Sequence, residues 1–349
     1  MENGPCRMVN STATEPHPES WNSHANIFFV DQPVGVGFSY ADYGEHVDTT
    51  EDAAQDIVAF VALFFENFPS FKSRSFHMAG ESYAGRYVPL FAAAVYDQNT
   101  ALLEAGLTPI NLTSAVIGNG LTERGTMFSS YYDMACTPAS LPPVLGISTC
   151  VRMKQAVPRC LKWHKESCVD YFDSMSCRAA TDFCSSELEA PYEDFGLNVF
   201  DISKPCEGLR RETFCYYIVT DIISYLSQPS TRNILGVDPA AQNFSVVSWP
   251  VNYAFDAADD VLHDSHEHVA ALLERGMRVL IYVGTYDWGC NWVGNERWTL
   301  ELEWSGREAF VDAEFREWDA GGKVAGKVPY DKPVEALALI NRWLDNVPL

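Results

Sequence analysis

The sequence predicts an α/β protein with a mostly parallel central sheet and helices on both faces. Short apolar runs rich in β-branched and aromatic residues alternate along the chain with longer segments of helical periodicity. Such alternation is typical of strands joined by crossover helices, which makes a parallel sheet. The chain has 349 residues, of which 47% are hydrophobic and 20% charged, so it can bury a large core.

The first predicted strand covers residues 25–30, an apolar run that is followed by a turn. A helix is then predicted to begin at Thr50, which can cap it, and to end before Pro69. Apolar residues at helical spacing fall on one face of this helix: Ala53, Ile57, Phe60, Val61, Phe64 and Phe68. This strand and this helix are the first two elements of the predicted α/β pattern.

The remaining elements continue this pattern. Residues 75–79 predict a strand that runs into a tight turn and a helix, and residues 115–120 predict the next strand. A helix over 269–275 leads into a strand over 278–283. The chain closes with an amphipathic helix over 333–344 that begins with proline.

The alternation is lost between about residue 125 and residue 255. An interruption of this kind predicts a cap inserted into the sheet domain. We therefore divide the chain into a first core part (1–124), a cap (125–255) and a second core part (256–349). Most cysteines lie in the cap, at irregular spacings that favour disulfides over a zinc site: Cys136, Cys150, Cys160, Cys168, Cys177, Cys184, Cys206 and Cys215.

Composition excludes several kinds of partner. The formal net charge is −23, from 47 acidic and 24 basic residues, so most of the surface repels a phosphate backbone and nucleic acid is not expected as a partner. We interpret this charge as a solvated acidic coat. The sequence contains no run of about 20 apolar residues, so no membrane span is predicted. Neither a metal nor a cofactor is expected.

Features of an oxidising secretory route are present without a signal peptide. Sequons occur at Asn10, Asn111 and Asn243, and they agree with the disulfide-rich cap. The first 18 residues show no basic segment followed by an apolar one. We therefore expect an amino terminus that is incomplete.

Residues 80–84, Gly-Glu-Ser-Tyr-Ala, predict a nucleophile elbow. Small residues two before and two after Ser82 allow a strand to turn sharply into a helix, which leaves the hydroxyl exposed at the edge of an α/β-hydrolase sheet. The backbone N–H of Tyr83 can then donate to a developing oxyanion. A turn serine is the alternative for so short a motif, but the strand and helix around it favour the nucleophile.

Glu81 places an acid beside this nucleophile, where a hydrolase would otherwise avoid negative charge. A carboxyl kept protonated by burial, or by sharing a proton with another carboxyl, could hydrogen-bond the terminal carboxylate of a peptide at low pH. The motif thus predicts recognition of a free carboxyl terminus.

Residues 80–89, GESYAGRYVP, resemble the signature around the nucleophile of serine carboxypeptidases, and segments 20–22, 31–40 and 117–122 resemble that family as well. The resemblance implies a serine-type carboxypeptidase that releases carboxy-terminal residues from peptides through an acyl-enzyme on Ser82. It further implies peptide or protein substrates with a free carboxyl terminus, a vacuolar, lysosomal or secreted location, and a monomer or weak oligomer.

The resemblance also assigns roles to other residues. Asp287 becomes the triad acid, in the loop after a predicted strand, and Glu2 becomes the carboxyl partner of Glu81. Cys290 takes the place of a thiol that lines the pocket for the leaving residue, although a small buried hydrophobe is an equal interpretation. Cys6 has no evident partner. The implied disulfides are Cys136 with Cys150, Cys160 with Cys184, Cys168 with Cys177, and Cys206 with Cys215.

The chain departs from the family pattern at the general base. Hydrolases of this fold order their triad Ser, Asp, His, but no histidine follows Asp287. The position expected for it, before Val328, holds Lys327, and residues 312–327 lack the apolar strand that should precede it. A lysine base would need a strongly lowered pKa. The histidines that precede Asp287 are His17, His24, His46, His77, His164, His263, His266 and His268.

A second departure is the family's Asn-Gly-Gly-Pro-Gly loop, which supplies another oxyanion donor and would lie before Met1. Both departures predict that peptide hydrolysis by the chain as written is impaired or absent. Two alternatives to a carboxypeptidase therefore stay open. One is a non-catalytic protein that binds peptides, and the other is an esterase or acyltransferase on the same fold.

Overall fold

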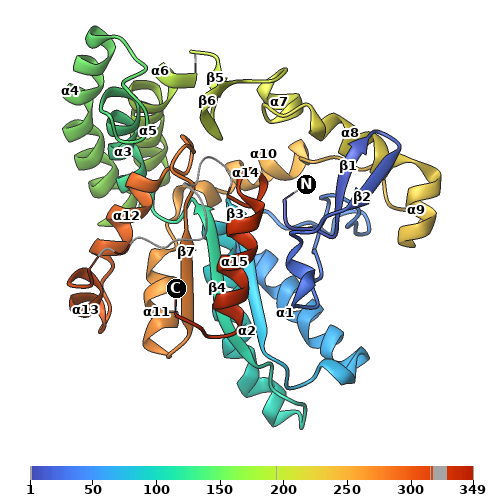
Figure 1. The fold of residues 1–349 in the computed structure, drawn as a ribbon. Coiled ribbons are helices and arrows are strands. Elements are labelled where there is room, and N and C mark those ends of the chain that lie inside the picture. The colour runs from blue at the N-terminus through green and yellow to red at the C-terminus, as the bar shows by residue number, and fades with distance from the viewer. Residues whose placement is uncertain (1, 194, 315, 317–327, 349) are drawn as a thin grey trace.

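The computed structural model describes residues 2–193, 195–314, 316 and 328–348 (Figure 1). Within these residues, the central sheet has three parallel strands in the order β3-β4-β7. Two short antiparallel pairs, β1 with β2 and β5 with β6, lie outside it. The strands are β1 (Cys6–Asn10), β2 (Ala13–Pro16), β3 (Phe76–Ser82), β4 (Leu112–Gly120), β5 (Leu197–Asn198), β6 (Asp201–Pro205) and β7 (Arg278–Tyr282).

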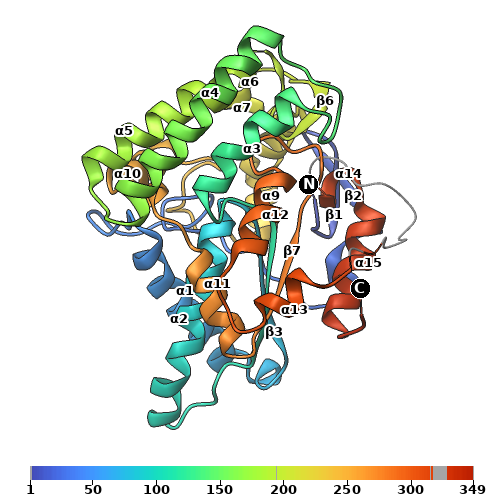
Figure 2. The same ribbon diagram turned by 90° about the vertical axis from the view of Figure 1, so that its left-hand side faces the viewer.

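Helices cover both faces of the sheet, as the sequence predicts. In Figure 2, α1, α2 and α11 lie on one side of the strands and α15 lies on the other. These helices are α1 (Thr50–Asn67), α2 (Ala84–Glu104), α11 (His266–Glu274) and α15 (Pro333–Leu344). Alternation along β4 explains both layers, because Ile117 packs with residues of α2 and α11 while Val116 packs with Trp21 and α15.

Most other helices gather beyond the carboxyl ends of the strands (Figure 1). They and the helices near the chain's end are α3 (Arg124–Cys136), α4 (Ile147–His164), α5 (Ser174–Cys184), α6 (Ala190–Glu193), α7 (Arg210–Thr213), α8 (Ile218–Ser227), α9 (Pro229–Leu235), α10 (Trp249–Ala257), α12 (Trp292–Glu301), α13 (Arg307–Val311) and α14 (Val328–Asp331). Short 3-10 turns cover Trp21–Ser23, Pro69–Phe71 and Asp260–Leu262, and π-turns cover Lys165–Val169 and Ser185–Glu189.

The helical segment carries four disulfides, and they join the same pairs that the family resemblance implies. The bonds are Cys136–Cys150, Cys160–Cys184, Cys168–Cys177 and Cys206–Cys215. Cys160 and Cys184 are fully buried in a core cluster that this segment forms together with Trp288 and Val293. The segment therefore shares its core with the chain that follows Asp287, and the boundaries 125 and 255 stay a prediction. Among the described residues, no helix is both long and apolar enough to cross a bilayer.

Two local predictions are wrong. Residues 25–30 form no strand, because Phe28 uses its ring to pack between Phe60 and Phe64 of α1 while the backbone stays outside the sheet ladder. The cap of α1 is Thr49, whose hydroxyl accepts from the Asp52 N–H, rather than Thr50. The other predicted strands and helices are present, with ends that differ by a few residues.

Candidate active site

A sharp turn joins β3 to α2 at Ser82. The backbone of Ser82 has φ 63°, in the left-handed region that side chains rarely adopt, and the residue is exposed. A Cβ atom at Gly80 would lie 2.4 Å from the Cβ of Ala84, so a larger pair would not fit. The structure thus contains the predicted elbow, with its serine at the carboxyl end of the strand.

The turn is held against the neighbouring strand. The Leu121 N–H, just after β4, donates to the Ser82 carbonyl at 2.9 Å. A Cβ at Gly85 would lie 2.5 Å from the Leu121 backbone nitrogen, so only glycine allows this approach. Because Tyr83 is the N-cap of α2, its N–H has no preceding helical turn to bond and can serve a ligand.

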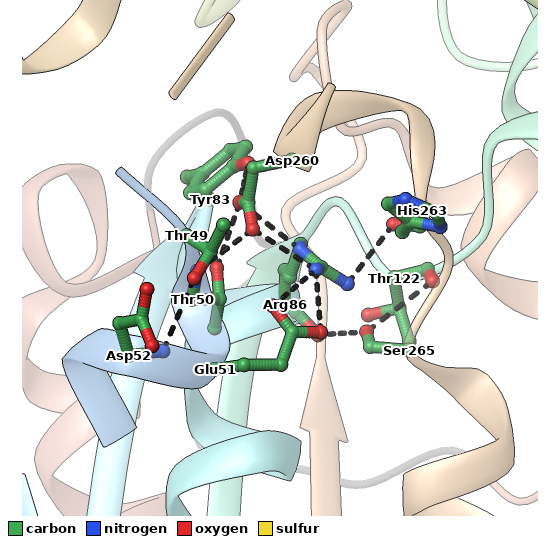
Figure 3. Close-up of polar contacts among 11 residues, drawn as sticks. Thr49, Thr50, Glu51, Asp52, Tyr83, Arg86, Thr122, Asp260, His263 and Ser265 are labelled. Carbon is green, nitrogen blue, oxygen red and sulfur yellow. Dashed lines mark hydrogen bonds and ion pairs between the residues drawn. The ribbon is translucent and has the colours of Figure 1, made fainter. Parts of the chain in front are cut away.

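The buried carboxylate of Asp260 anchors the elbow (Figure 3). Asp260 accepts the Tyr83 hydroxyl at 2.5 Å, and it accepts Arg86 through Nε at 3.1 Å and Nη2 at 3.0 Å. It also accepts the backbone N–H and the hydroxyl of Thr50. Arg86 reaches Glu51 at 2.9 Å as well. One carboxylate therefore ties the first turn of α2 to the start of α1.

The contacts within this network keep Asp260 ionised and Tyr83 protonated. Burial alone would raise the pKa of Asp260, but the Arg86 guanidinium with the Tyr83 and Thr50 donors outweighs burial and holds that pKa below its ordinary value. Burial and then Asp260 raise the pKa of the Tyr83 phenol, so it stays a donor. Sequence patterns missed Asp260 because its partners lie far along the chain.

Asp287 lies in the loop after β7 and is 4% exposed. Its Oδ1 accepts the Cys290 N–H at 2.8 Å. Asn119, at the end of β4, accepts the Gly284 N–H at 3.1 Å and thereby fixes the start of the loop. Because β3 and β7 flank β4 in parallel, Ser82 and Asp287 follow strands that end at the same edge, with strand axes about 10 Å apart. An imidazole placed between them could contact both.

Aromatic residues of the helical segment pack on the Asp287 loop. Trp288 is buried between Tyr192, at 4.0 Å between ring centroids, and Tyr131, at 5.0 Å. The Tyr131 hydroxyl also donates to the Gly289 carbonyl. Burial, and then Asp287, raise the pKa of the Cys290 thiol, so it stays neutral. The loop is thus held from both the sheet and the helices beyond it.

The charges of Glu81 and Glu2 both act on the phenol of Tyr282. In the sheet register Glu81 is opposite Gly118, and Gly118 is opposite Tyr282. Burial raises the pKa of Tyr282 most, and the charges of Glu81 and then Glu2 raise it further, which places both carboxyl groups within electrostatic range of that phenol. The segment that carries Glu2 is bound through its carbonyl, which accepts from His17 Nε2 at 3.0 Å.

Several histidines have other contacts in the structure. His77, on the same strand as Ser82, bonds to the Ser114 hydroxyl through Nδ1 at 2.7 Å, His164 is buried against Phe128, and His263 stacks on Phe172. Lys327, the weighed substitute base, lies outside the described residues. The sequons at Asn10, Asn111 and Asn243 are all exposed, and Cys6 is exposed as a free thiol.

The parallel sheet, the strained serine between strand and helix, and the buried acid after a later strand define an α/β hydrolase. Comparison with known proteins then narrows this class. The profile of the family described as "Serine carboxypeptidase" matches residues 1–346. The chain therefore belongs to the serine carboxypeptidase family.

Curated relatives agree with this family. The chain is 37% identical over 362 residues to carboxypeptidase Y of Candida albicans, with 99% of the chain and 64% of that protein covered. It is 36% identical over 369 residues to carboxypeptidase Y of Saccharomyces cerevisiae, with 99% of the chain and 66% of that protein covered. The chain thus spans about two thirds of the length of these relatives.

A solved structure shares the fold. The crystal structure of Kex1(delta)p, a prohormone-processing carboxypeptidase from Saccharomyces cerevisiae, matches with a TM-score of 0.78 at 21% identity. The match covers 99% of this chain and 79% of that one.

Proposed function

We propose that the site is that of a serine-type carboxypeptidase, which releases the last residue of a peptide through an acyl-enzyme on Ser82. The observation that carries this proposal is the strained, exposed serine at the end of β3 with Glu81 directly before it. Membership of the serine carboxypeptidase family supports the reaction class.

The proposed chemistry assigns each residue one task. The Ser82 Oγ attacks the last peptide carbonyl while its proton passes to a base, and the Tyr83 N–H stabilises the oxyanion. Collapse breaks the peptide bond, and the leaving amino acid takes a proton. Water then attacks the acyl-enzyme and regenerates the hydroxyl. We assign to Asp287 the task of orienting an imidazole base.

Specificity for a carboxyl terminus comes from the Glu81 and Glu2 carboxyl groups. Two carboxyls that share one proton can donate to a substrate carboxylate, which ties binding to acidic pH. Cys290 is assigned to the pocket of the leaving residue. The partners are peptides or proteins with a free carboxyl terminus, and the four disulfides support a vacuolar, lysosomal or secreted location.

The lack of a histidine base limits the rate of peptide hydrolysis. Because no histidine follows Asp287 in the 349 residues, acylation of Ser82 by this chain is slowed by several orders of magnitude. Binding of the peptide does not need the base and is retained. The proposal therefore separates two measurable properties, recognition and turnover.

Recognition is tested by calorimetric titration at pH 5 with an N-acylated dipeptide and with its carboxy-terminal amide. We expect the acid to bind at least tenfold more tightly, and equal affinities would overturn the assignment. Turnover is tested with a fluorophosphonate probe, with Ser82→Ala as the control. We expect slow labelling that this variant abolishes, whereas labelling as fast as that of active serine hydrolases would refute the argument about the base.

A further inference from the structure

Three residues form a row across the sheet, on the face that α15 covers. Glu81 on β3, Gly118 on β4 and Tyr282 on β7 are opposite one another in the register. Residues opposite each other in parallel strands point to the same face. Gly118 is the middle member of this row and has no side chain, so it leaves an open space between the other two.

The Tyr282 ring fills that space. A Cβ atom built at Gly118 would lie 2.2 Å from the ring Cζ and 2.3 Å from the hydroxyl oxygen. The hydroxyl therefore lies over β4, one strand closer to Glu81 than the backbone that carries it. Neighbouring strands are about 4.8 Å apart, so roughly one strand spacing separates this hydroxyl from the β3 backbone at Glu81.

The segment that carries Glu2 is hydrogen-bonded to the turn at residues 20–21, which packs in the same core cluster as the Tyr282 ring. The neighbouring Asn3 carbonyl accepts the Trp21 N–H and the Ser20 hydroxyl, each at 3.1 Å. Trp21 belongs to the core cluster on which Tyr282 packs. The charges that act on the Tyr282 phenol within the described chain are those of Glu81 and Glu2. Glu81 also acts on the Cys290 thiol, and Glu2 acts on the Tyr330 phenol.

We propose that the Tyr282 hydroxyl is a positioning group that donates a hydrogen bond to the Glu81 and Glu2 carboxyl pair and sets the pH at which the pair accepts a peptide's terminal carboxylate. The inference rests on the proposed function and adds to it a donor that fixes where the pair holds its proton.

The direction of the effect follows from the chemistry of a phenol. Burial and the two carboxyl groups raise the pKa of the Tyr282 phenol. The phenol therefore stays protonated and acts as a hydrogen-bond donor. A donor stabilises the ionised form of a carboxyl pair, which lowers the pH at which the pair loses its shared proton. Tyr282 thereby confines tight binding of a substrate carboxylate to a lower pH.

The test measures the affinity of an N-acylated dipeptide between pH 4 and pH 8 in the wild type and in Tyr282→Phe. We expect the pH midpoint of tight binding to rise by about one unit in the variant, the size expected for one hydrogen bond to a charged group. The affinity for the peptide amide should not change. Tyr96→Phe, on the exposed side of α2, is the matched control and should keep the wild-type midpoint.

A second variant perturbs the ring without removing the hydroxyl. In Gly118→Ala the new methyl group occupies the place of the phenol, so the ring must move and the midpoint should rise as in Tyr282→Phe. An unchanged midpoint in Tyr282→Phe, or in a folded Gly118→Ala, overturns the inference. If the wild type itself does not distinguish acid from amide at any pH, the proposed function fails instead, so the two failures are distinguishable.

Discussion

Arg86 binds two carboxylates whose environments differ, and this difference predicts unequal costs of removing them. The Asp260 side chain is 0% exposed and that of Arg86 is 4% exposed, whereas the Glu51 side chain is 60% exposed. Breaking a buried ion pair leaves an uncompensated charge and costs about 3–5 kcal/mol, while an exposed pair contributes at most about 1 kcal/mol. Asp260→Asn should therefore lower the free energy of unfolding by about 4 kcal/mol.

Glu51→Gln is the matched control, because it removes the exposed partner of the same guanidinium. Urea unfolding with the disulfides intact measures both variants, and we expect their midpoints to differ by the equivalent of about 3 kcal/mol. Losses that agree within about 1 kcal/mol would refute the view that burial decides the value of this network. The same variants can be titrated with the fluorophosphonate probe, since Asp260 also holds Tyr83.

The pH dependence of this pair has a definite sign. The folded-state pKa of Asp260 is lowered, so its ionised form stabilises the fold above the unfolded pKa, and this stabilisation is lost as the pH falls through the lower folded value. The gap between the wild type and Asp260→Asn should therefore be full at neutral pH and shrink below about pH 4.

Two further predictions follow from other contacts. Gly85→Ala should cost about 1–3 kcal/mol of stability because its methyl group meets backbone, whereas Gly146→Ala, with open space around it, should cost little, and equal midpoints in urea would contradict this. Burial and then the charge of Glu123 raise the pKa of Asp264 from 3.8 to about 7, so the folded state holds the proton more tightly. Stability should fall as pH rises from about 4 to about 7, and Asp264→Asn should flatten that slope in unfolding measured across the range.

Local sequence was sufficient for the elbow. The small residues around Ser82 specify a sharp turn, and the strand and helix on either side are readable from their periodicity, so the structure contains the turn where it was predicted. The disulfide pairs came from family resemblance, because spacing alone permits many connectivities. The roles of Asp287, Glu2 and Cys290 stay predictions.

Non-local contacts could not be read from the sequence. Asp260 looks like any loop aspartate until the fold brings it to Arg86, and Tyr282 looks like a core residue of a strand until the register places it over Gly118. Residues 25–30 have the composition of a strand, but composition cannot tell whether an apolar run joins a ladder or packs through its side chains.

The position of Asp260 in the chain has a consequence for how such proteins can diverge. The helical segment that begins after β4 ends with α10, and Asp260 follows it immediately in a short turn. The loops and helices between are held by four disulfides and can change in length and sequence where they do not pack on the Asp287 loop. The point at which the chain leaves this segment is fixed, because Asp260, which closes the segment, also binds Tyr83 beside Ser82.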